Sequence, residues 1–412
     1  MRFKKLFLAM AMSSMMATLA AGVSGCTSTD AGSTANTATG VFAPAQVKAD
    51  FVKGADISTL REMEAVGYKY YGFDGQEGDA LTLLQQQGFN YVRLRLWNDP
   101  YDANGNAYGG GTNDLETDLA LAKRAKDLGM GFLLDFHYSD FWTDPGKQFK
   151  PKAWANLSFD ELKQAVYQYT YDTITAFKEA GVMPDMVQVG NEITSGMLWP
   201  DGKSWGQGGG EFDRLSELLK SGIAGVKDAA GDAEVQIMLH LDKGTKQEQY
   251  KWWFDEITAR NVPFDVIGMS MYTWWDGPIS DLSNNIKFVN DTYHKDVYVV
   301  EAAYAYGLDN PDGIDNTFTQ KEADTSGYPA TVEGQAQYLK DLMEAISSNE
   351  NGKGLFYWEP AWKAHENITW ATKAGMDYTN DQWKEGNSRE NQALFDDQGK
   401  ILESVKVFND AQ

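Results

Sequence analysis

From residue 51 onward the sequence alternates short apolar runs with longer segments of helical periodicity, and this alternation most constrains the fold. Eight runs have the length of a strand: Phe51–Ser58, Asn90–Trp97, Gly131–Ser139, Asp185–Glu192, Glu234–Leu241, Phe264–Tyr272, Asp296–Tyr304 and Gly354–Pro360. Apolar runs with little polar alternation are typical of parallel strands that are buried on both faces. Eight βα units predict an α/β fold, a single (β/α)8 TIM barrel with long βα loops.

Amphipathic segments separate these runs, for example Asp114–Leu128, Phe159–Ala180, Glu211–Ala229 and Glu333–Ser348. Their apolar residues have the spacing of helices that cover a sheet. A doubly wound sheet is the alternative fold, but no G-x-G-x-x-G motif follows the first run. Because no linker separates a second domain, we assign residues 47–412 to one barrel domain.

The N-terminus has the features of an export signal. Basic residues at positions 2, 4 and 5 precede an apolar stretch, and Gly22–Cys26 resembles the lipobox of bacterial lipoproteins. Cys26 is the only cysteine, which excludes an intramolecular disulfide and favours lipid attachment at this residue. We therefore predict a signal peptide at 1–25, a flexible tether at 26–46 and a secreted protein anchored at the cell surface. The alternative is an ordinary signal peptide cleaved elsewhere.

Charge and aromatic content narrow the choice of partner. The net charge of −23 argues against nucleic acids and polyanionic substrates, although an acidic surface also serves solubility. The chain contains 13 Trp, 20 Tyr and 20 Phe, and aromatic rings in polar loops are suited to stacking on sugars. We expect a monomer that binds a neutral polysaccharide.

Two glutamates, Glu192 and Glu301, end the fourth and seventh apolar runs. The C-terminal ends of barrel strands meet on one face, which is where such barrels carry their active sites. Other polar residues that the strands bring to this face are Arg93, Arg95, Asp135, His137, Asn191, His240 and Tyr272. One such residue is more often structural, but several strand ends with polar side chains on one face predict a site.

A pair of carboxylates at this place predicts a retaining glycosidase. Glu192 is the expected general acid, and Glu301 is the expected nucleophile, held ionised by Arg93 or Arg95 and by the Tyr272 hydroxyl. The carboxyl groups should lie about 5–5.5 Å apart. Such hydrolysis uses carboxylates and water, so we expect no organic cofactor.

Two loop features suggest further binding sites. The strand ends and their loops contain candidate stacking residues, Trp142, Trp274, Trp358 and Trp362. The loop after the seventh run is rich in oxygen ligands that suit calcium: Asp309, Asn310, Asp312, the Ile314 carbonyl and Asn316. The alternative for this loop is an Asx-rich turn without a metal.

Several motifs together resemble glycoside hydrolase family 53, the endo-β-1,4-galactanases. They are Gly54–Ser58, Tyr91–Trp97, Asp135–Gln148, Val189–Thr194, Tyr298–Glu301, Phe356–Trp362 and Asn391–Asp396. The resemblance implies Glu192 as acid/base, Glu301 as nucleophile, and endo-hydrolysis of β-1,4-galactan in pectin with retention. It also implies that Trp358 lies under the central sugar and that some members bind calcium in the 309–316 loop.

Two other functions stay open at the level of sequence. A mannanase or xylanase of the same clan would have the same catalytic pair. A surface glycan-binding lipoprotein without activity is the alternative from another class of protein.

Overall fold

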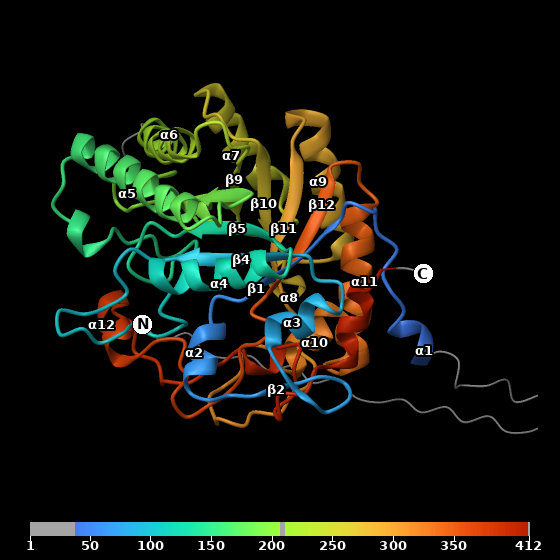
Figure 1. The fold of residues 1–412 in the computed structure, drawn as a ribbon. Coiled ribbons are helices and arrows are strands. Elements are labelled where there is room, and N and C mark those ends of the chain that lie inside the picture. The colour runs from blue at the N-terminus through green and yellow to red at the C-terminus, as the bar shows by residue number, and fades with distance from the viewer. Residues whose placement is uncertain (1–37, 207–210, 411–412) are drawn as a thin grey trace, which may run out of the picture.

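A computed structural model describes residues 38–206 and 211–410 (Figure 1). Eight parallel strands close into a barrel in the order β1-β12-β11-β10-β9-β6-β5-β4. Their bounds are β1 Val52–Asp56, β4 Tyr91–Leu96, β5 Gly131–Phe136, β6 Met186–Val189, β9 Gln236–Leu241, β10 Val266–Ser270, β11 Asp296–Ala302 and β12 Gly352–Trp358. Seven predicted runs contain one barrel strand each, and the eighth, Gly354–Pro360, overlaps β12, which begins two residues earlier; the predicted (β/α)8 barrel is confirmed.

Helices surround the barrel. The outer helices are α3 Ala80–Gln85, α4 Leu115–Asp127, α5 Phe159–Glu179, α6 Glu211–Ala230, α7 Gln247–Ala259, α9 Ile279–Tyr293 and α11 Val332–Ser347. Shorter elements are α1 Ala38–Val41, α2 Leu60–Ala65, α8 Thr273–Asp276, α10 Gln320–Ser326, α12 Lys373–Thr379, η1 Lys152–Trp154, η2 Ile193–Ser195, η3 Glu390–Gln392 and η4 Glu403–Phe408. Two hairpins pair β2 Tyr70–Tyr71 with β3 Glu77–Gly78, and β7 Gly196–Met197 with β8 Gly202–Lys203.

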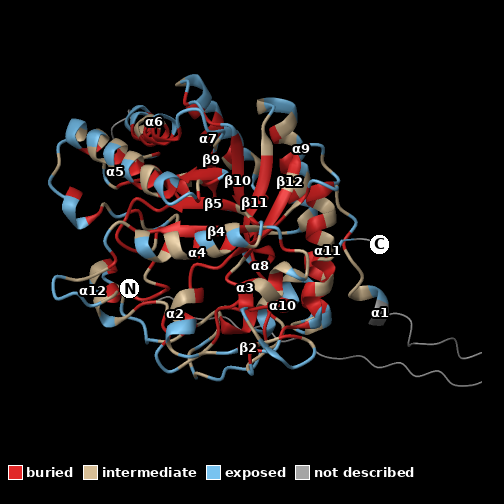
Figure 2. Ribbon diagram, in the orientation of Figure 1, coloured by how far each residue is buried: buried red, intermediate tan, exposed pale blue. Residues whose placement is uncertain are grey.

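The helices begin where side chains cap their free N–H groups. Ser158 and Glu161 form a reciprocal capping box at the start of α5, and Asp114 accepts the Thr117 N–H at the start of α4. Figure 2 shows buried residues along the barrel strands, and helices whose buried and exposed residues alternate. Each outer helix therefore packs an apolar stripe against the barrel.

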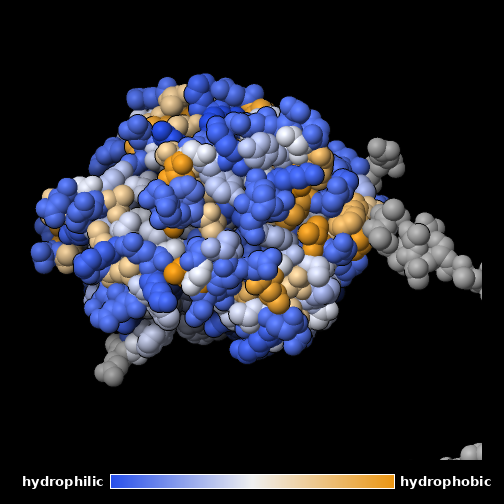
Figure 3. Space-filling view, turned by 90° about the horizontal axis from the view of Figure 1, so that it is seen from below, coloured by the Kyte–Doolittle hydropathy of each residue, from blue (hydrophilic) through white to orange (hydrophobic). Residues whose placement is uncertain are grey.

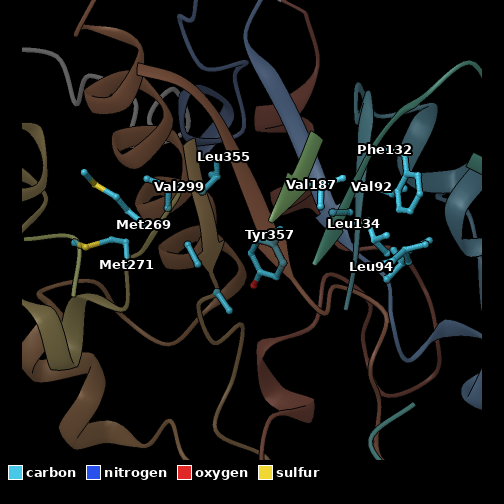
Figure 4. Close-up of a cluster of buried hydrophobic side chains, with 14 of the residues drawn as sticks. Val92, Leu94, Phe132, Leu134, Val187, Met269, Met271, Val299, Leu355 and Tyr357 are labelled. Atoms are coloured by element: carbon cyan, nitrogen blue, oxygen red, sulfur yellow. The ribbon is translucent and has the colours of Figure 1, made fainter. Parts of the chain in front are cut away.

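Successive residues of each strand point alternately into the barrel and towards the helices. Val92 and Leu94 of β4 belong to the apolar layer between strands and helices, which Figure 4 shows together with neighbouring residues. Arg93, which lies between them on β4, points to the interior. A separate apolar cluster lies inside the barrel: Leu133, Met186, Met238, Val266, Tyr298, Val300 and Phe356. It supports the polar layer above it.

Close packing inside the barrel requires residues without side chains at two positions. A Cβ atom on Gly131 would lie 1.9 Å from the Tyr91 ring, and one on Gly54 would lie 2.1 Å from the Phe356 ring. Large rings on one strand thus fill the space that glycine leaves on the next, as dense cores require.

Strand β11 carries an irregularity beside the site. Met269 pairs with Val299, but the next residue of β10, Ser270, pairs with Glu301. The extra residue, Val300, points into the barrel core. Regular alternation would send Val300 and Glu301 to opposite faces, and a β-bulge re-aims the second side chain. The bulge therefore turns Glu301 towards the same interior as Val300.

The N-terminal segment was expected to be a tether up to residue 46. Its last residues contact the domain, because Ala45 is buried and its N–H donates to the Val407 carbonyl at 2.9 Å. The ordered structure thus begins before residue 47. The predicted signal peptide and Cys26 lie outside the described residues. None of the helices within 38–206 and 211–410 is long and apolar enough to cross a membrane.

Candidate active site

A pocket of about 510 Å³ lies at the C-terminal ends of the barrel strands. Its lining includes the predicted residues Arg93, Arg95, His137, Trp142, Asn191, Glu192, Tyr272, Glu301, Trp358 and Trp362. Asp135, His240 and Trp274, which were also predicted to contact substrate, do not line it. Figure 3 shows one outer face of the molecule, which is mainly hydrophilic with separate hydrophobic patches.

Arg93 connects five side chains beneath the pocket. Its guanidinium contacts Asp56 (2.9 Å), Asp135 (2.7 Å), Glu301 (3.0 Å), Asn191 (2.9 Å) and Gln188 (3.3 Å). An arginine side chain has five N–H donors, and each finds an acceptor here. A buried cation is stable only when it is paired in this way. The network joins β1, β4, β5, β6 and β11.

Glu301 has two partners that favour its ionised form. Arg93 contacts Oε1, and the Tyr272 hydroxyl donates to Oε2 at 3.1 Å. Burial raises the pKa of Glu301, and Asp135 and Asp56 add to this, whereas Arg93 and Tyr272 lower it. The sequence-based choice of Arg93 or Arg95 is thus resolved geometrically, since Arg93 is the arginine that pairs with Glu301.

Glu192 is held differently. Its backbone is left-handed, with φ of 48° and ψ of 50°, a conformation that costs a non-glycine residue on the order of 1 kcal/mol. The Ser270 hydroxyl donates to Oε1 at 2.6 Å, and the backbone N–H donates to His240 Nδ1 at 3.2 Å. Burial raises the pKa of Glu192 well above its usual range, and the charge of Glu301 raises it further.

The two carboxyl groups therefore have unequal surroundings. Glu301 has an arginine within ion-pair distance, and no ion pair to Glu192 is found among the described residues. Glu301 is the group that ionises first, and Glu192 is the group that retains its proton. Two neighbouring carboxyls with divergent pKa values are what acid and nucleophile roles require. Their predicted separation stays a prediction.

Arg95 serves a second buried pair. It contacts Glu359 at 2.5 Å and donates to the Gly110 carbonyl at 2.7 Å. The guanidinium carbon also lies 4.2 Å from the centre of the Trp142 ring. Burial raises the pKa of Glu359 to about 7 despite Arg95. This pair fixes the orientation of Trp142 by a cation–π contact.

Asp135, His137 and Asn191 are held by the protein itself. His137 Nε2 lies 3.3 Å from Asp135, while Nδ1 accepts the Thr143 N–H at 3.1 Å. Asn191 accepts from Arg93, and its amide donates to the Thr143 carbonyl at 2.8 Å. These residues orient the strand ends, and His137 and Asn191 also reach the pocket.

The aromatic lining differs from the expectation at one position. Trp142, Trp358 and Trp362 all line the pocket, and Trp142 and Trp362 are stacked with centres 6.3 Å apart. Trp274 is only 7% exposed and packs on Phe318, whereas Trp275 is 53% exposed and lines the pocket. The short helix α8 separates these neighbours, because successive helical residues point in different directions.

Sequence reasoning missed several lining residues. Ser270 ends β10, two positions before Tyr272 and within the predicted run Phe264–Tyr272, so alternation was a usable signal. Arg389 carries its guanidinium 5.4 Å from the ring centres of both Trp275 and Trp358. It comes from the segment after β12, far from any strand end, and nothing in the sequence indicated it.

The 309–316 loop folds on its own hydrogen bonds. The Asn310 amide donates to the Ile314 carbonyl at 2.7 Å, and the Asn316 amide donates to the Asp309 carbonyl at 3.1 Å. Asp312 accepts the Ile314 N–H at 2.8 Å. The bond to Asp312 is that of an Asx turn, and the other two join side-chain amides to backbone carbonyls of the same loop. Among the described residues, no group of three or more His, Cys, Asp or Glu is placed to share a metal.

Three oxygen atoms at or beside this loop nevertheless have no hydrogen-bond partner of ordinary geometry among the described residues, although the Asn316 side chain lies close enough to Glu390 to lower its pKa. They are Asn316 Oδ1 and both carboxyl oxygens of buried Glu390. Burial raises the pKa of Glu390 to about 7, and the charge of Asp312 adds to the shift. Unpaired buried oxygens next to a second carboxylate fit a cation with oxygen ligands.

A barrel with two carboxyl groups and an aromatic lining in one pocket defines a glycoside hydrolase. The sequence profile of glycosyl hydrolase family 53 matches residues 52–408. The chain is 38% identical to the endo-beta-1,4-galactanase of Bacillus subtilis (strain 168) over 382 residues, covering 88% of this chain and 86% of that protein. It is 32% identical to the arabinogalactan endo-beta-1,4-galactanase of Humicola insolens over 363 residues, covering 87% and 98%.

A solved structure agrees with these relatives. The GH53 catalytic domain of Ignisphaera aggregans superposes with a TM-score of 0.81 at 41% identity, covering 89% of this chain and 99% of that one. The chain belongs to glycosyl hydrolase family 53.

Replacing Arg93 with Met should leave Asp135 and Glu301 without this cation, and Asp56 with Arg95 alone at 3.6 Å. We expect the free energy of unfolding in urea to fall by about 3–5 kcal/mol, because removing one partner of a buried ion pair exposes the full desolvation cost of the other. Arg124→Met is the matched control, since Arg124 pairs with Glu64 and Asp79 in a half-exposed site, where loss of about 1 kcal/mol or less is expected. Equal losses in the two variants would contradict the role of the Arg93 network.

Proposed function

We propose that this protein hydrolyses internal β-1,4-galactosidic bonds of galactan, including the type I arabinogalactan of pectin, with retention of configuration. The observation that carries this proposal is the placement of Glu192 and Glu301 in one pocket, where Arg93 pairs with Glu301 and not with Glu192. The names of the relatives, endo-beta-1,4-galactanase and arabinogalactan endo-beta-1,4-galactanase, support the substrate.

In the proposed reaction, Glu301 Oε2 or Oε1 attacks the anomeric carbon while Glu192 gives its proton to the departing glycosidic oxygen. A glycosyl ester on Glu301 forms and the glycosidic C–O bond breaks. Glu192, now ionised, then takes a proton from water as the water attacks the same carbon and releases Glu301. Arg93 and Tyr272 stabilise the carboxylate before attack and again when it leaves.

The rest of the pocket suits a neutral sugar chain. Trp142, Trp358 and Trp275 present rings for stacking on sugar faces, and Trp358 is the proposed floor under the central sugar. Carboxylates of Asp144 and Asp242 also line the pocket and would repel anionic chains. All of these groups come from one chain, so the protein can act as a monomer.

The two alternative functions are not favoured. The relatives named above, at 38% and 32% identity, carry galactanase names, so a mannanase or xylanase has no specific support. A glycan-binding protein without activity would have no use for the Arg93–Glu301 pair or for the partners of Glu192.

Galactan hydrolysis is tested by the release of reducing ends from linear β-1,4-galactan beside mannan, xylan and carboxymethyl cellulose. We expect release from galactan alone, and a loss of at least about 10³-fold in Glu301→Gln because the amide is no nucleophile. Glu179→Gln, at an exposed carboxyl on α5, is the matched control and should match the wild type.

Early product examined by NMR should have the β configuration of the substrate. An α product would contradict retention, release from another polymer would contradict the substrate, and polymer binding without hydrolysis would favour the binding protein.

We also propose that calcium binds at the 309–316 loop. Asp312 and Asn316 are the first ligands, Glu390 is added because its oxygens have no hydrogen-bond partner of ordinary geometry among the described residues, and Asp309, Asn310 and the Ile314 carbonyl stand behind them. The ion would be structural, since the loop supplies oxygen ligands and no part of the reaction uses it.

If calcium binds there, chelation with EDTA should lower the melting temperature by several degrees, because a ligand that binds only the folded state stabilises it. Added calcium should restore it. Glu390→Gln should reduce the response, while Glu179→Gln should leave it intact. An unchanged melting temperature, with no calcium in metal analysis of the purified protein, would favour the Asx turns alone.

Finally, we propose that Cys26 is lipidated and holds the secreted enzyme at the bacterial cell surface. The single cysteine after an apolar N-terminal stretch supports this. Cells fed a radiolabelled fatty acid should label the wild type but not Cys26→Ala, which should be released to the medium. Labelling that persists in Cys26→Ala, or its absence in the wild type, would favour an ordinary signal peptide.

A further inference from the structure

His240 holds Glu192 at two points, although it does not line the pocket. Nδ1 accepts the backbone N–H of Glu192 at 3.2 Å, and Nε2 lies 2.9 Å from the Ser270 hydroxyl, which in turn contacts Glu192 Oε1 at 2.6 Å. The imidazole is fully buried on β9. The His240 ring and the Ser270 hydroxyl thus connect the backbone N–H of Glu192 to its own carboxyl group through three hydrogen bonds.

The backbone N–H of Glu192 sets the direction of the other hydrogen bonds in this chain. A backbone N–H can only donate, so the Nδ1 atom that receives it carries no proton. The Gln188 amide also approaches Nδ1, at 2.9 Å, and its orientation is fixed because its oxygen accepts from Arg93. Burial lowers the pKa of His240 well below its usual value, and Arg93 lowers it further, so the ring is neutral. Its one proton is therefore on Nε2.

Asn191 is the other group near this ring. Its Oδ1 lies 3.2 Å from Nδ1, but that oxygen already accepts from Arg93 at 2.9 Å. The Asn191 amide group is engaged with the Thr143 carbonyl, which prevents a flip. Nδ1 thus faces two donors, the Glu192 N–H and the Gln188 amide, and one acceptor, Asn191 Oδ1, which already accepts from Arg93. Nδ1 is therefore the accepting atom of the ring.

The serine completes the chain in one direction. Because Nε2 donates to Ser270 Oγ, the hydroxyl proton is free to point at Glu192 Oε1. An oxygen that accepts a short hydrogen bond from a hydroxyl is a poor place for a proton of its own. The transferable proton of Glu192 is therefore on Oε2.

We propose that His240 and Ser270 form a one-way hydrogen-bond relay that keeps Oε1 of Glu192 as an acceptor and holds the transferable proton on Oε2. Both are positioning residues, because they act through Glu192. The inference rests on the proposed acid/base role of Glu192. The relay also supports the left-handed backbone of Glu192, which its N–H bond to His240 helps to fix.

Loss of the serine hydroxyl has a defined effect on acidity. The Ser270 hydrogen bond stabilises the carboxylate and lowers the pKa of Glu192, against burial and the charges of Glu301, Asp242 and Asp144. His240 faces Arg93, Asp135 and His137. None of these groups is altered in Ser270→Ala, so the pKa of Glu192 should rise. The basic limb of the pH profile of kcat/KM should move to higher pH, since this limb reports ionisation of the acid.

The decisive measurement is kcat/KM on two substrates, β-1,4-galactan and an aryl β-galactobioside with a 2,4-dinitrophenolate leaving group. The activated leaving group departs without a proton. We expect Ser270→Ala to lose up to about 100-fold on galactan, as misplaced catalytic groups do, and far less on the aryl substrate. His240→Ala should lose more on galactan than Ser270→Ala. The double variant should resemble His240→Ala, because residues of one chain are not additive.

Controls separate this effect from damage to the fold. Ser216→Ala removes a buried hydroxyl on α6 that has no hydrogen-bond partner in the described structure, and should match the wild type on both substrates. Ser270→Cys keeps the volume of the side chain but donates weakly, and it should show the same contrast between substrates even if Ser270→Ala does not fold.

The outcomes are distinct. Equal losses on both substrates, or an unmoved basic limb, in folded Ser270→Ala or Ser270→Cys would overturn the relay. Galactan hydrolysis by Glu192→Gln at the wild-type rate would instead overturn the role of Glu192, and with it the proposed mechanism.

Discussion

The buried guanidinium of Arg93 is the interaction on which the rest of the site depends. Its five donors meet acceptors from four other strands of the barrel. Three of these acceptors are carboxylates, and their burial would be costly without a cation to pair with them. The apolar cluster below, with rings set against glycines, leaves this layer no room to shift. The position of Glu301 is thus decided by charge pairing on one side and by close packing on the other.

The same network gives the two glutamates of the pocket different surroundings. Glu301 is turned inward by the β11 bulge and receives a cation, so its ionised form is favoured. Glu192 lies beyond the end of β6, where its carboxyl group accepts from the neutral Ser270 hydroxyl and its backbone N–H donates to His240. Burial acts on both, and Arg93 is a cationic partner that Glu301 has and that Glu192 lacks among the described residues. This asymmetry supports the proposed roles of Glu192 as acid and Glu301 as nucleophile.

The barrel could be predicted from sequence because each strand is an apolar run and the helices have clear periodicity. Glu192, Glu301, Arg93 and Tyr272 followed, since strand ends converge on one face of a barrel. The bulge could not be foreseen, because no local signal marks an extra residue in β11. Whether Trp274 or Trp275 reaches the pocket depends on the exact turn of α8. His240 was expected to contact substrate, but it lies behind Ser270. Arg389 comes from a segment without periodicity, so only tertiary structure brings it to the pocket.

The pairing of β1 with β12 has a consequence for the folding of the chain. The first strand is held on one side by β4 and on the other by the last strand, so the cylinder cannot shut until residue 358 is available. The residues that follow β12, including Trp362 and Arg389, form one wall of the pocket. Contacts between distant parts of a chain form slowly. A polypeptide synthesised from its N-terminus therefore exposes the unpaired edges of an incomplete barrel until the last strand is made, and its pocket is complete only with the residues that follow position 358.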